Sequence, residues 1–482
     1  PEKKIMFAAN KEYLESHEIS SVLEKIVNNT VALKPADPIG FMSRELEKLS
    51  KPPVISRVVG REVLDSRGNP TVEADIYCTV RGEEILVARS GAPSGASTGS
   101  NEAHELRDKD SGRFLGKGTK TASANVSEAL NKVLKGADPC NLAAVDKAMC
   151  DADGTELKTN LGGNALTAVS FAAAEAGAKL ANQELYAYFA KAFGKDTSGK
   201  FSMPRPMVNI LNGGKHAGGN LKIQEFMIVP KQAAFADMLQ SVTEVYHNLG
   251  KILVAKHGLS SKNLGDEGGF APNLDNAEQA LTLIEEAITA AGYTAGEDMF
   301  LALDCAASEF YDAATSKYNI AVKQALSTAE MVDFYVKLQA AHPALISIED
   351  GLDEKDYEGW KLLTEKLGSK IMLVGDDLYT TNTNLIKQGV AEEWANALLL
   401  KVNQIGTISE SMAAARMIFG ASQNVIVSHR SGETVSAIIA DLAVGIGAGF
   451  IKTGATARGE RISKYNRLLQ IEESLREQNL LA

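Results

Sequence analysis

The sequence predicts an α/β protein in which a (β/α)8 barrel follows an α+β domain and a small helical hairpin. Strand-like alternation begins at Val54, and apolar runs that each end in an ionisable residue recur through the carboxy-terminal half. The first fifty residues show helical periodicity instead. We therefore expect a helix-loop-helix module at residues 1–52, the α+β domain at 53–199 and the barrel at 200–482.

The composition is that of a globular protein. The chain has 482 residues, of which 45% are hydrophobic and 23% charged, enough for two or more domains with cores of their own. Fifty Lys and Arg residues against sixty-one Asp and Glu residues give a net charge of −11. This balance disfavours binding to nucleic acid or to an anionic membrane surface.

The cysteines and the apolar stretches bear on the compartment. Four cysteines without a CxxC pair are too few for a disulfide scaffold in a chain of this size, so we expect a reducing compartment such as the cytoplasm. Every apolar stretch is shorter than the ~20 residues that span a bilayer, and the amino end lacks the apolar core of a secretory signal. We therefore expect neither a membrane nor nucleic acid as a partner.

An apolar stripe in the first fifty residues predicts an amphipathic helix that begins near Lys11 and ends at Lys34-Pro35. The stripe consists of Ile19, Val22, Leu23, Ile26 and Val27. Asp37 and Pro38 have the form of an N-cap and a first helical residue, so a second helix follows. Two helices of this size cannot bury both apolar faces within one copy, so the hairpin should pair with another copy or pack on the body.

The next segment has the pattern of an α+β domain. Residues 71–80 alternate as a strand does, and residues 65–70 form a turn between two strands. Ala-rich stretches at 121–135 and 164–182 predict helices. Prolines at positions 204 and 206 then mark a boundary, since helices tend to stop before such residues.

Six short apolar runs in the remaining sequence each end in an ionisable residue. These residues are Asp304, Glu349, Asp376, Lys401, His429 and Lys452. The last five follow at intervals of 27, 25, 28 and 23 residues, about one strand, one helix and two loops. In a closed parallel barrel the carboxyl ends of the strands share one mouth, so the six side chains should converge there. One such residue alone usually marks only the start of a loop, but six in register favour a site.

The residue types at this mouth indicate a metal-assisted reaction. Asp304, Glu349 and Asp376 offer the hard oxygen ligands that suit Mg²⁺, whereas no Cys or His cluster supports zinc. Lys401 is a candidate general base, provided that a neighbouring cation or metal lowers its pKa well below the usual value of about 10.4. Metal bound to a substrate carboxylate would stabilise the charge left by proton removal from the adjacent carbon. The predicted reaction class is proton abstraction α to a carboxylate.

Longer motifs occur in order along residues 54–482. They stand at 67–70 (RGNP), 94–99 (SGASTG), 213–219 (GGKHAGG), 224–227 (QEFM), 265–269 (GDEGG), 398–404 (LLLKVNQ), 428–434 (SHRSGET) and 451–454 (IKTG). Together they resemble the enolase family of glycolytic 2-phosphoglycerate dehydratases. The resemblance implies reversible dehydration of 2-phospho-D-glycerate to phosphoenolpyruvate, with two Mg²⁺ per active site.

The resemblance also implies roles for individual residues. The first Mg²⁺ would be held by the three carboxylates named above, and Ser97, on the Gly-rich loop, would help to hold the second once that loop closes over substrate. Lys401 would remove the C2 proton, and Glu267 would be the acid that assists loss of the C3 hydroxyl. Glu225 would support that acid and its water, and His216 would lie on a mobile loop near the phosphate.

The remaining implied residues bind substrate. Arg430 and Ser431 would bind the phosphate and Lys452 the carboxylate, with His429 beside them. The family fold is an α+β cap on a barrel that opens with two strands and two helices, and its members are usually homodimers. Departures from the family pattern, such as Tyr379 where Thr is common, remove no catalytic role.

The amino-terminal segment is similar to a different family, the dimerisation/docking domain of cAMP-dependent protein kinase regulatory subunits. The similarity covers about 40 residues, including the helical stripe and residues 34–42 (KPADPIGFM). It implies that residues 11–50 pair into a four-helix bundle and accept an amphipathic helix from an anchoring protein, often in a cilium or flagellum. The alternative function is a structural or scaffold subunit of such an assembly with incidental catalysis.

Overall fold

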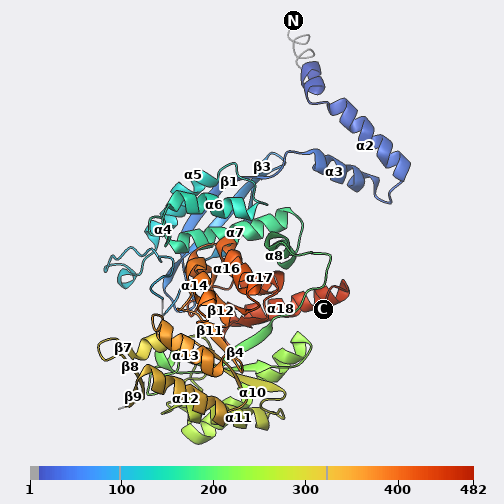
Figure 1. Ribbon diagram of the computed structural model, residues 1–482. Helices are drawn as coiled ribbons and strands as arrows, with labels where there is room; N and C mark the ends of the chain where they lie inside the picture. The colour runs from blue at the N-terminus through green and yellow to red at the C-terminus, as the bar shows by residue number, and fades with distance from the viewer. Residues whose placement is uncertain (1–9, 97–98, 322–323) are drawn as a thin grey trace.

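The computed structural model describes residues 10–96, 99–321 and 324–482. Figure 1 shows a helical hairpin at the amino end, a sheet with helices packed on it, and a barrel surrounded by helices. This arrangement confirms the predicted fold class. Ser97 lies outside the described residues. No helix in the described ranges is long and apolar enough to cross a membrane.

The hairpin consists of α2 (Ile19–Leu33) and α3 (Pro38–Leu49). Residues 10–16 are also helical, but the backbone turns at His17 and Glu18, where Glu18 has a φ of 51°. The prediction of one continuous helix from near Lys11 is therefore wrong. The predicted N-cap of the second helix is confirmed, because the Asp37 side chain accepts a hydrogen bond from the Gly40 N–H at 2.9 Å.

Most apolar side chains of the hairpin are exposed. Ile26 is buried, but Val31 is 66% exposed on α2 and Ile39 is 70% exposed on α3. Figure 1 shows the hairpin extending away from the barrel. Glu47 of α3 forms an ion pair of 3.0 Å with Arg81, which directly follows β2. Both side chains are more than half exposed, so the pair adds little stability. The hairpin thus does not pack on the barrel.

The segment that follows forms a three-stranded antiparallel sheet covered by helices. The strands are β1 (Val54–Leu64), β2 (Pro70–Val80) and β3 (Glu83–Gly91), in that order across the sheet. The helices are α4 (Lys120–Asn125), a π-helical turn (Val126–Leu130), α5 (Asn131–Leu134), α6 (Leu142–Asp153), α7 (Gly163–Leu180) and α8 (Leu185–Phe193), with a short 3₁₀ turn at Phe114–Gly116. Ala-rich α7 is almost fully buried and packs on β2 and β3. We call β1 to α8 the cap.

The barrel closes through eight strands in the order β10-β11-β12-β13-β14-β4-β5-β6. They are β4 (Arg205–Asn212), β5 (Glu225–Pro230), β6 (Met299–Asp304), β10 (Leu345–Glu349), β11 (Met372–Gly375), β12 (Ala397–Leu400), β13 (Asn424–Ser428) and β14 (Phe450–Lys452). Apolar side chains such as Met227, Ala302 and Leu399 fill the interior, so the barrel is a packed core.

Helices surround the barrel, and a small sheet lies outside it. The helices are α9 (Gly214–Ala217), α10 (Phe235–His257), α11 (Ala277–Ala290), α12 (Thr328–Ala341), α13 (Tyr357–Leu367), α14 (Thr383–Ala391), α15 (Val402–Ile405), α16 (Ile408–Gly420), α17 (Ile438–Ile446) and α18 (Gly459–Glu477), with 3₁₀ turns at Leu259–Lys262 and Ala307–Phe310. The outer sheet contains β7 (Tyr311–Asp312), β8 (Lys317–Ala321) and β9 (Gln324–Leu326). The chain order β4, β5, α10, α11 matches the opening of two strands and two helices expected from the resemblance.

One strand of the barrel runs against the others. β5 is antiparallel to both β4 and β6, whereas every other neighbouring pair is parallel. The first residue of β5, Glu225, is therefore paired in register with the last residue of β6, Asp304. A carboxylate at the start of a strand thus reaches the mouth at which the other strands end.

The cap and the barrel are joined by close helix packing. Helix α17 of the barrel lies on α8 of the cap, and Gly445 of α17 is in close contact with α8. A Cβ added at Gly445 would lie 2.6 Å from Phe189 Cβ and 2.7 Å from the Tyr186 carbonyl oxygen. Only a residue without a side chain fits this contact.

We expect Gly445→Ala to lower the free energy of unfolding by about 1–3 kcal/mol, because the added methyl group forces α17 and α8 apart. Urea denaturation measures the loss. Gly420→Ala, at the end of α16, is the control, since a Cβ there meets no atom within 4 Å. An equal loss of stability in both variants would contradict the tight packing of α17 on α8.

Candidate active site

The six strand-end side chains lie where their spacing predicts. Asp304, Glu349 and Lys452 end β6, β10 and β14, and Asp376, Lys401 and His429 directly follow β11, β12 and β13. All six are at the carboxyl ends of parallel strands. His216, Glu267, Arg430 and Ser431 line the same pocket, together with Glu225. The candidate residues within the described ranges therefore gather at one mouth.

The ammonium group of Lys452 lies at the centre of this mouth, where it is 2% exposed. It donates to Asp304 Oδ2 at 2.8 Å and to Glu349 Oε1 and Oε2 at 2.9 and 2.8 Å. Glu225 Oε2 is 3.3 Å away. Burial would lower the pKa of Lys452, but the charges of Asp304, Glu225 and Glu349 outweigh burial and raise it well above its ordinary value.

The two carboxylates that face Lys452 most closely differ in their pKa. Burial opposes ionisation of Asp304, but the charge of Lys452 outweighs it and lowers the pKa of Asp304. Burial and the charge of Asp304 raise the pKa of Glu349 well above its ordinary value. More negative charge is gathered here than one lysine neutralises.

Lys401 donates a short hydrogen bond from Nζ to Asp376 Oδ2. Burial alone would lower the pKa of Lys401, but the charge of Asp376 outweighs it and the pKa is raised. A protonated lysine cannot accept a proton. The lowered pKa that the sequence argument requires therefore depends on a cation that takes up the charge of Asp376.

A second acidic group lies beside Lys452. His216 Nδ1 is 3.5 Å from Glu225 Oε1 and 3.9 Å from Glu267 Oε1. Burial and the charge of Glu267 raise the pKa of Glu225 well above its ordinary value. Burial also opposes ionisation of Glu267, but His429 and His216 outweigh it and lower the pKa of Glu267. This pair of carboxylates can hold one proton between them, as an acid-base pair must.

His429 is fixed in one tautomer by its neighbours. Arg461 approaches His429 Nδ1 at 2.8 Å, and a guanidinium only donates, so Nδ1 is the acceptor. Burial, with the nearby charge of Arg461, lowers the pKa of His429 to about 4. The neutral ring therefore carries its proton on Nε2, which lies 3.1 Å from Glu267 Oε2.

The donor set at the mouth fits a magnesium ion. Among the described residues, two groups of three could hold an ion, with ligand atoms that all lie within 4.8 Å of one another. One contains Asp350, Asp376 and Asp377, and the other contains His216, Glu225 and Glu267. Burial and the charge of Asp376 raise the pKa of Asp350 well above its ordinary value. Hard oxygen ligands with excess negative charge suit Mg²⁺. Of the predicted triad, Asp376 belongs to such a cluster, whereas Asp304 and Glu349 belong to neither and contact Lys452 instead.

Sequence reasoning missed several residues at the mouth. Glu102 contacts Arg430, Gln404 contacts Asp376, and Asp350 accepts hydrogen bonds from the Asp376 and Asp377 N–H groups at 2.9 Å. Asp350 directly follows Glu349, so a second acid at a strand end was a usable signal. Gln404 closes the motif at 398–404 without a role of its own there, and Glu102 does not directly follow a strand, so no local pattern places either side chain at the mouth.

Comparison with known families agrees with this geometry. The family model described as the enolase C-terminal TIM barrel domain matches residues 200–482. The chain belongs to the enolase family. The model of the enolase N-terminal domain matches residues 55–189, which cover the cap except for the first residue of β1 and the last residues of α8. The chain is therefore an enolase-type enzyme, and residues 1–54 precede both matches.

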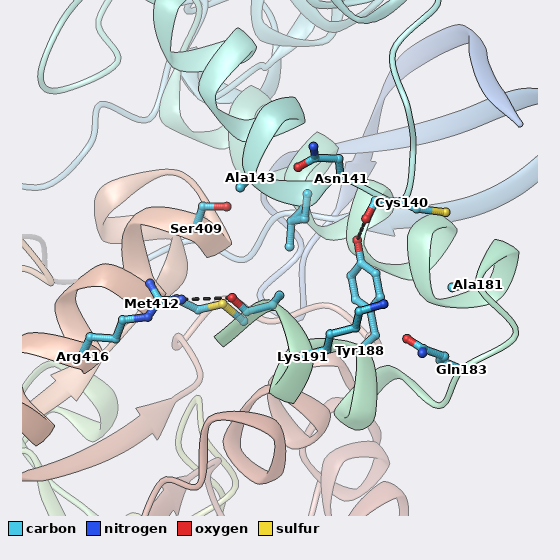
Figure 2. A pocket seen from close by; sticks show the side chains of 12 residues that line it. Cys140, Asn141, Ala143, Ala181, Gln183, Tyr188, Lys191, Ser409, Met412 and Arg416 are labelled. Carbon is cyan, nitrogen blue, oxygen red and sulfur yellow. Dashed lines mark hydrogen bonds between the residues drawn. The ribbon is translucent and has the colours of Figure 1, made fainter. Parts of the chain in front are cut away.

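A groove of about 420 Å³ lies between α6, α8 and α16 (Figure 2). Within the described ranges, none of the residues that line it also lines the mouth. Lys191 and Arg416 stand at its rim, but Arg416 already donates to the Ala192 carbonyl at 3.0 Å and to the Phe193 carbonyl at 3.3 Å. None of the described residues that line it is acidic. The groove therefore lacks the carboxylates that are gathered at the mouth.

Lys452→Met is expected to lower the free energy of unfolding by about 3–5 kcal/mol, because it leaves buried carboxylates without their cation. Denaturation in a buffer with chelator measures the change. Lys147→Met is the control, since the Lys147–Asp151 ion pair is exposed and contributes less than about 1 kcal/mol. Equal stability of the two variants would show that the Lys452 cluster is unimportant for stability.

Proposed function

We propose that the protein catalyses the reversible dehydration of 2-phospho-D-glycerate to phosphoenolpyruvate. Membership of the enolase family supports the reaction class. The observation that carries the proposal is the gathering of Lys401, Glu267 and the strand-end carboxylates at one mouth, since dehydration needs a base, an acid and a charge-stabilising centre together.

The proton transfers are assigned to two sides of the mouth. Lys401 removes the C2 proton, and Glu267 is the acid that assists departure of the C3 hydroxyl. Because the pKa of Glu267 is lowered in the substrate-free protein, this role requires that Glu267 first gain a proton. Glu225 and His216 support Glu267. His216 Nδ1 lies 3.5 Å from Glu225 Oε1 and 3.9 Å from Glu267 Oε1 in the substrate-free protein, which allows closer contacts in a complex. The neutral His429 carries its proton on Nε2, which lies 3.1 Å from Glu267 Oε2.

Two Mg²⁺ ions are proposed as cofactors. Asp304, Glu349 and Asp376 would hold the first, and Ser97 would help to hold the second. When bound, Mg²⁺ supplies positive charge that stabilises the negative charge developing on the substrate carboxylate. The buried excess of carboxylates supports this assignment, as does the raised pKa of Glu349.

The substrate anion is proposed to bind through cations from the barrel. Arg430 and Ser431 would bind the phosphate, and Lys452 the carboxylate. The Arg430 side chain is 3% exposed and that of Lys452 is 2% exposed, so both act in a medium where charge attraction is strong. The net charge of −11 thus does not oppose an anionic substrate.

Lys401→Ala should lower turnover of 2-phosphoglycerate by about 10²–10⁴-fold, because the base for the C2 proton is lost. Ultraviolet absorbance of phosphoenolpyruvate and exchange of the C2 proton measure it in the presence of Mg²⁺. Lys401→Arg should be equally inactive, since arginine keeps the charge beside Asp376 but does not deprotonate. Lys361→Ala, at an exposed ion pair, is the control and should keep full activity.

Exchange of the C2 proton at the wild-type rate in Lys401→Ala would contradict the assignment of the base. A well-folded wild-type protein without any turnover would contradict the proposed reaction. It would favour the alternative, a scaffold subunit in which the enolase body has no catalytic task.

We further propose that the amino-terminal hairpin tethers a homodimeric enzyme to a larger cytoplasmic assembly, such as a ciliary or flagellar structure. The proposal is supported by the apolar side chains that α2 and α3 leave exposed. Pairing of two hairpins would bury them, and the resulting bundle would accept an amphipathic helix of an anchoring protein. Local supply of phosphoenolpyruvate for ATP production is the proposed purpose.

Deletion of residues 1–52 should leave turnover unchanged and abolish association with an anchoring protein. Val27→Asp should do the same, because it places a charge on the apolar face of α2, where Val27 is 47% exposed. Co-purification from the native source, followed by turnover assays, measures both effects. Glu24→Ala, also on α2, is the control. Persistence of the same partners after deletion would contradict the tether.

A further inference from the structure

Glu102 of the cap holds Arg430 of the barrel through both of its carboxylate oxygens. Arg430 NH1 donates to Glu102 Oε2 at 2.8 Å, and Arg430 NH2 donates to Glu102 Oε1 at 3.2 Å. The Glu102 side chain is 7% exposed and that of Arg430 is 3% exposed. A two-point contact of this kind fixes the plane of the guanidinium as well as its position.

The same carboxylate continues into the metal side of the mouth through Gln404. Gln404 Nε2 donates to Glu102 Oε1 at 3.3 Å and to Asp376 Oδ1 at 2.7 Å. Thr381 Oγ1 donates to Gln404 Oε1 at 2.9 Å, which sets the orientation of the amide. A buried chain of hydrogen bonds thus runs from Arg430 through Glu102 and Gln404 to Asp376.

The backbone anchors the start of this chain. The Gly99 N–H donates to Glu102 Oε1 at 3.1 Å, and the Ala103 N–H donates to the Gln404 carbonyl at 2.6 Å. Glu102 is therefore held by backbone groups of its own segment as well as by Gln404, and it can restrain the guanidinium. Arg430 NH1 also donates to Asn403 Oδ1 at 3.1 Å, so Glu102 is not the sole side chain that orients the arginine.

We propose that Glu102 is a positioning residue that orients Arg430 for the phosphate group of the substrate. It acts through Arg430 and does not touch the reacting atoms. The inference rests on the proposed function, because it takes the substrate to carry a phosphate. It also gives the cap a task at the mouth, since Glu102 and Arg430 are 328 residues apart and belong to different domains.

Charge alone predicts the opposite effect of Glu102 on phosphate affinity. A carboxylate beside Arg430 repels an incoming phosphate, so its removal would tighten phosphate binding if repulsion dominated. If orientation of Arg430 matters more than repulsion, phosphate binding depends on the carboxylate lying at the right distance from the guanidinium. The two effects differ for Glu102→Asp, which keeps the charge but withdraws the carboxylate by one methylene group.

The experiment compares Glu102→Gln and Glu102→Asp with the wild-type protein in the presence of Mg²⁺. Inorganic phosphate is the probe, and its affinity is measured by calorimetry. We expect phosphate to bind about tenfold more weakly to both variants, as for loss of one charge-assisted hydrogen bond. The KM for 2-phosphoglycerate should rise by a similar factor, with a smaller change in kcat.

Glu62→Gln is the matched control. Glu62 also holds an arginine of the cap, Arg113, through both oxygens, but the pair does not line the mouth. It should lower thermal stability without changing phosphate affinity. A merely structural role of Glu102 would give the same result as this control.

Wild-type phosphate affinity in Glu102→Asp, or tighter binding in Glu102→Gln, would overturn the positioning role. If Glu102→Gln does not fold, Glu102→Asp still decides, because it retains the buried charge. Phosphate binding that weakens in both variants of a protein without turnover would contradict the proposed function but leave the positioning role intact.

Discussion

The burial of several like charges at the barrel mouth is the constraint on which the rest of the structure depends. Carboxylates cannot leave water without cations or protons, so Lys452 is held among Asp304, Glu349 and Glu225, and Lys401 is held by Asp376. Each lysine is thereby kept protonated in the substrate-free protein. The chemistry proposed for the mouth then depends on which charge is neutralised next. A divalent cation beside Asp376 would favour the neutral form of Lys401, which the proposed role of Lys401 as a base requires.

The cap contributes to this electrostatic balance from outside the barrel. Glu102 brings one more carboxylate to the mouth, and it meets the buried guanidinium of Arg430. The tight contact between α17 and α8 keeps the two domains in the register that this pairing needs. The α17–α8 packing far from the mouth and the Glu102–Arg430 pair within it therefore both hold the cap on the barrel.

Most of the mouth was predictable, because its residues follow buried strands at regular intervals. The barrel, the strand-end positions of Asp304 through Lys452 and the N-cap at Asp37 all come from local pattern. Glu102 was not predictable, since its contact joins residues far apart in the chain, and the turn at Glu18 carries no local signal such as glycine. The domain boundaries at 52/53 and 199/200, the residue roles and the homodimer remain predictions.

The reversed direction of β5 has a further consequence. Strand β5 ends, and β6 begins, at the end of the barrel opposite the mouth. The connection between them therefore has to cross the height of the barrel an even number of times. Helices α10 and α11 are those two traversals, and the loop between them turns at the mouth with Glu267 on it. One inverted strand thus brings two carboxylates to the mouth. Glu225 is at the start of that strand, and Glu267 is in the loop between the two helices that follow it.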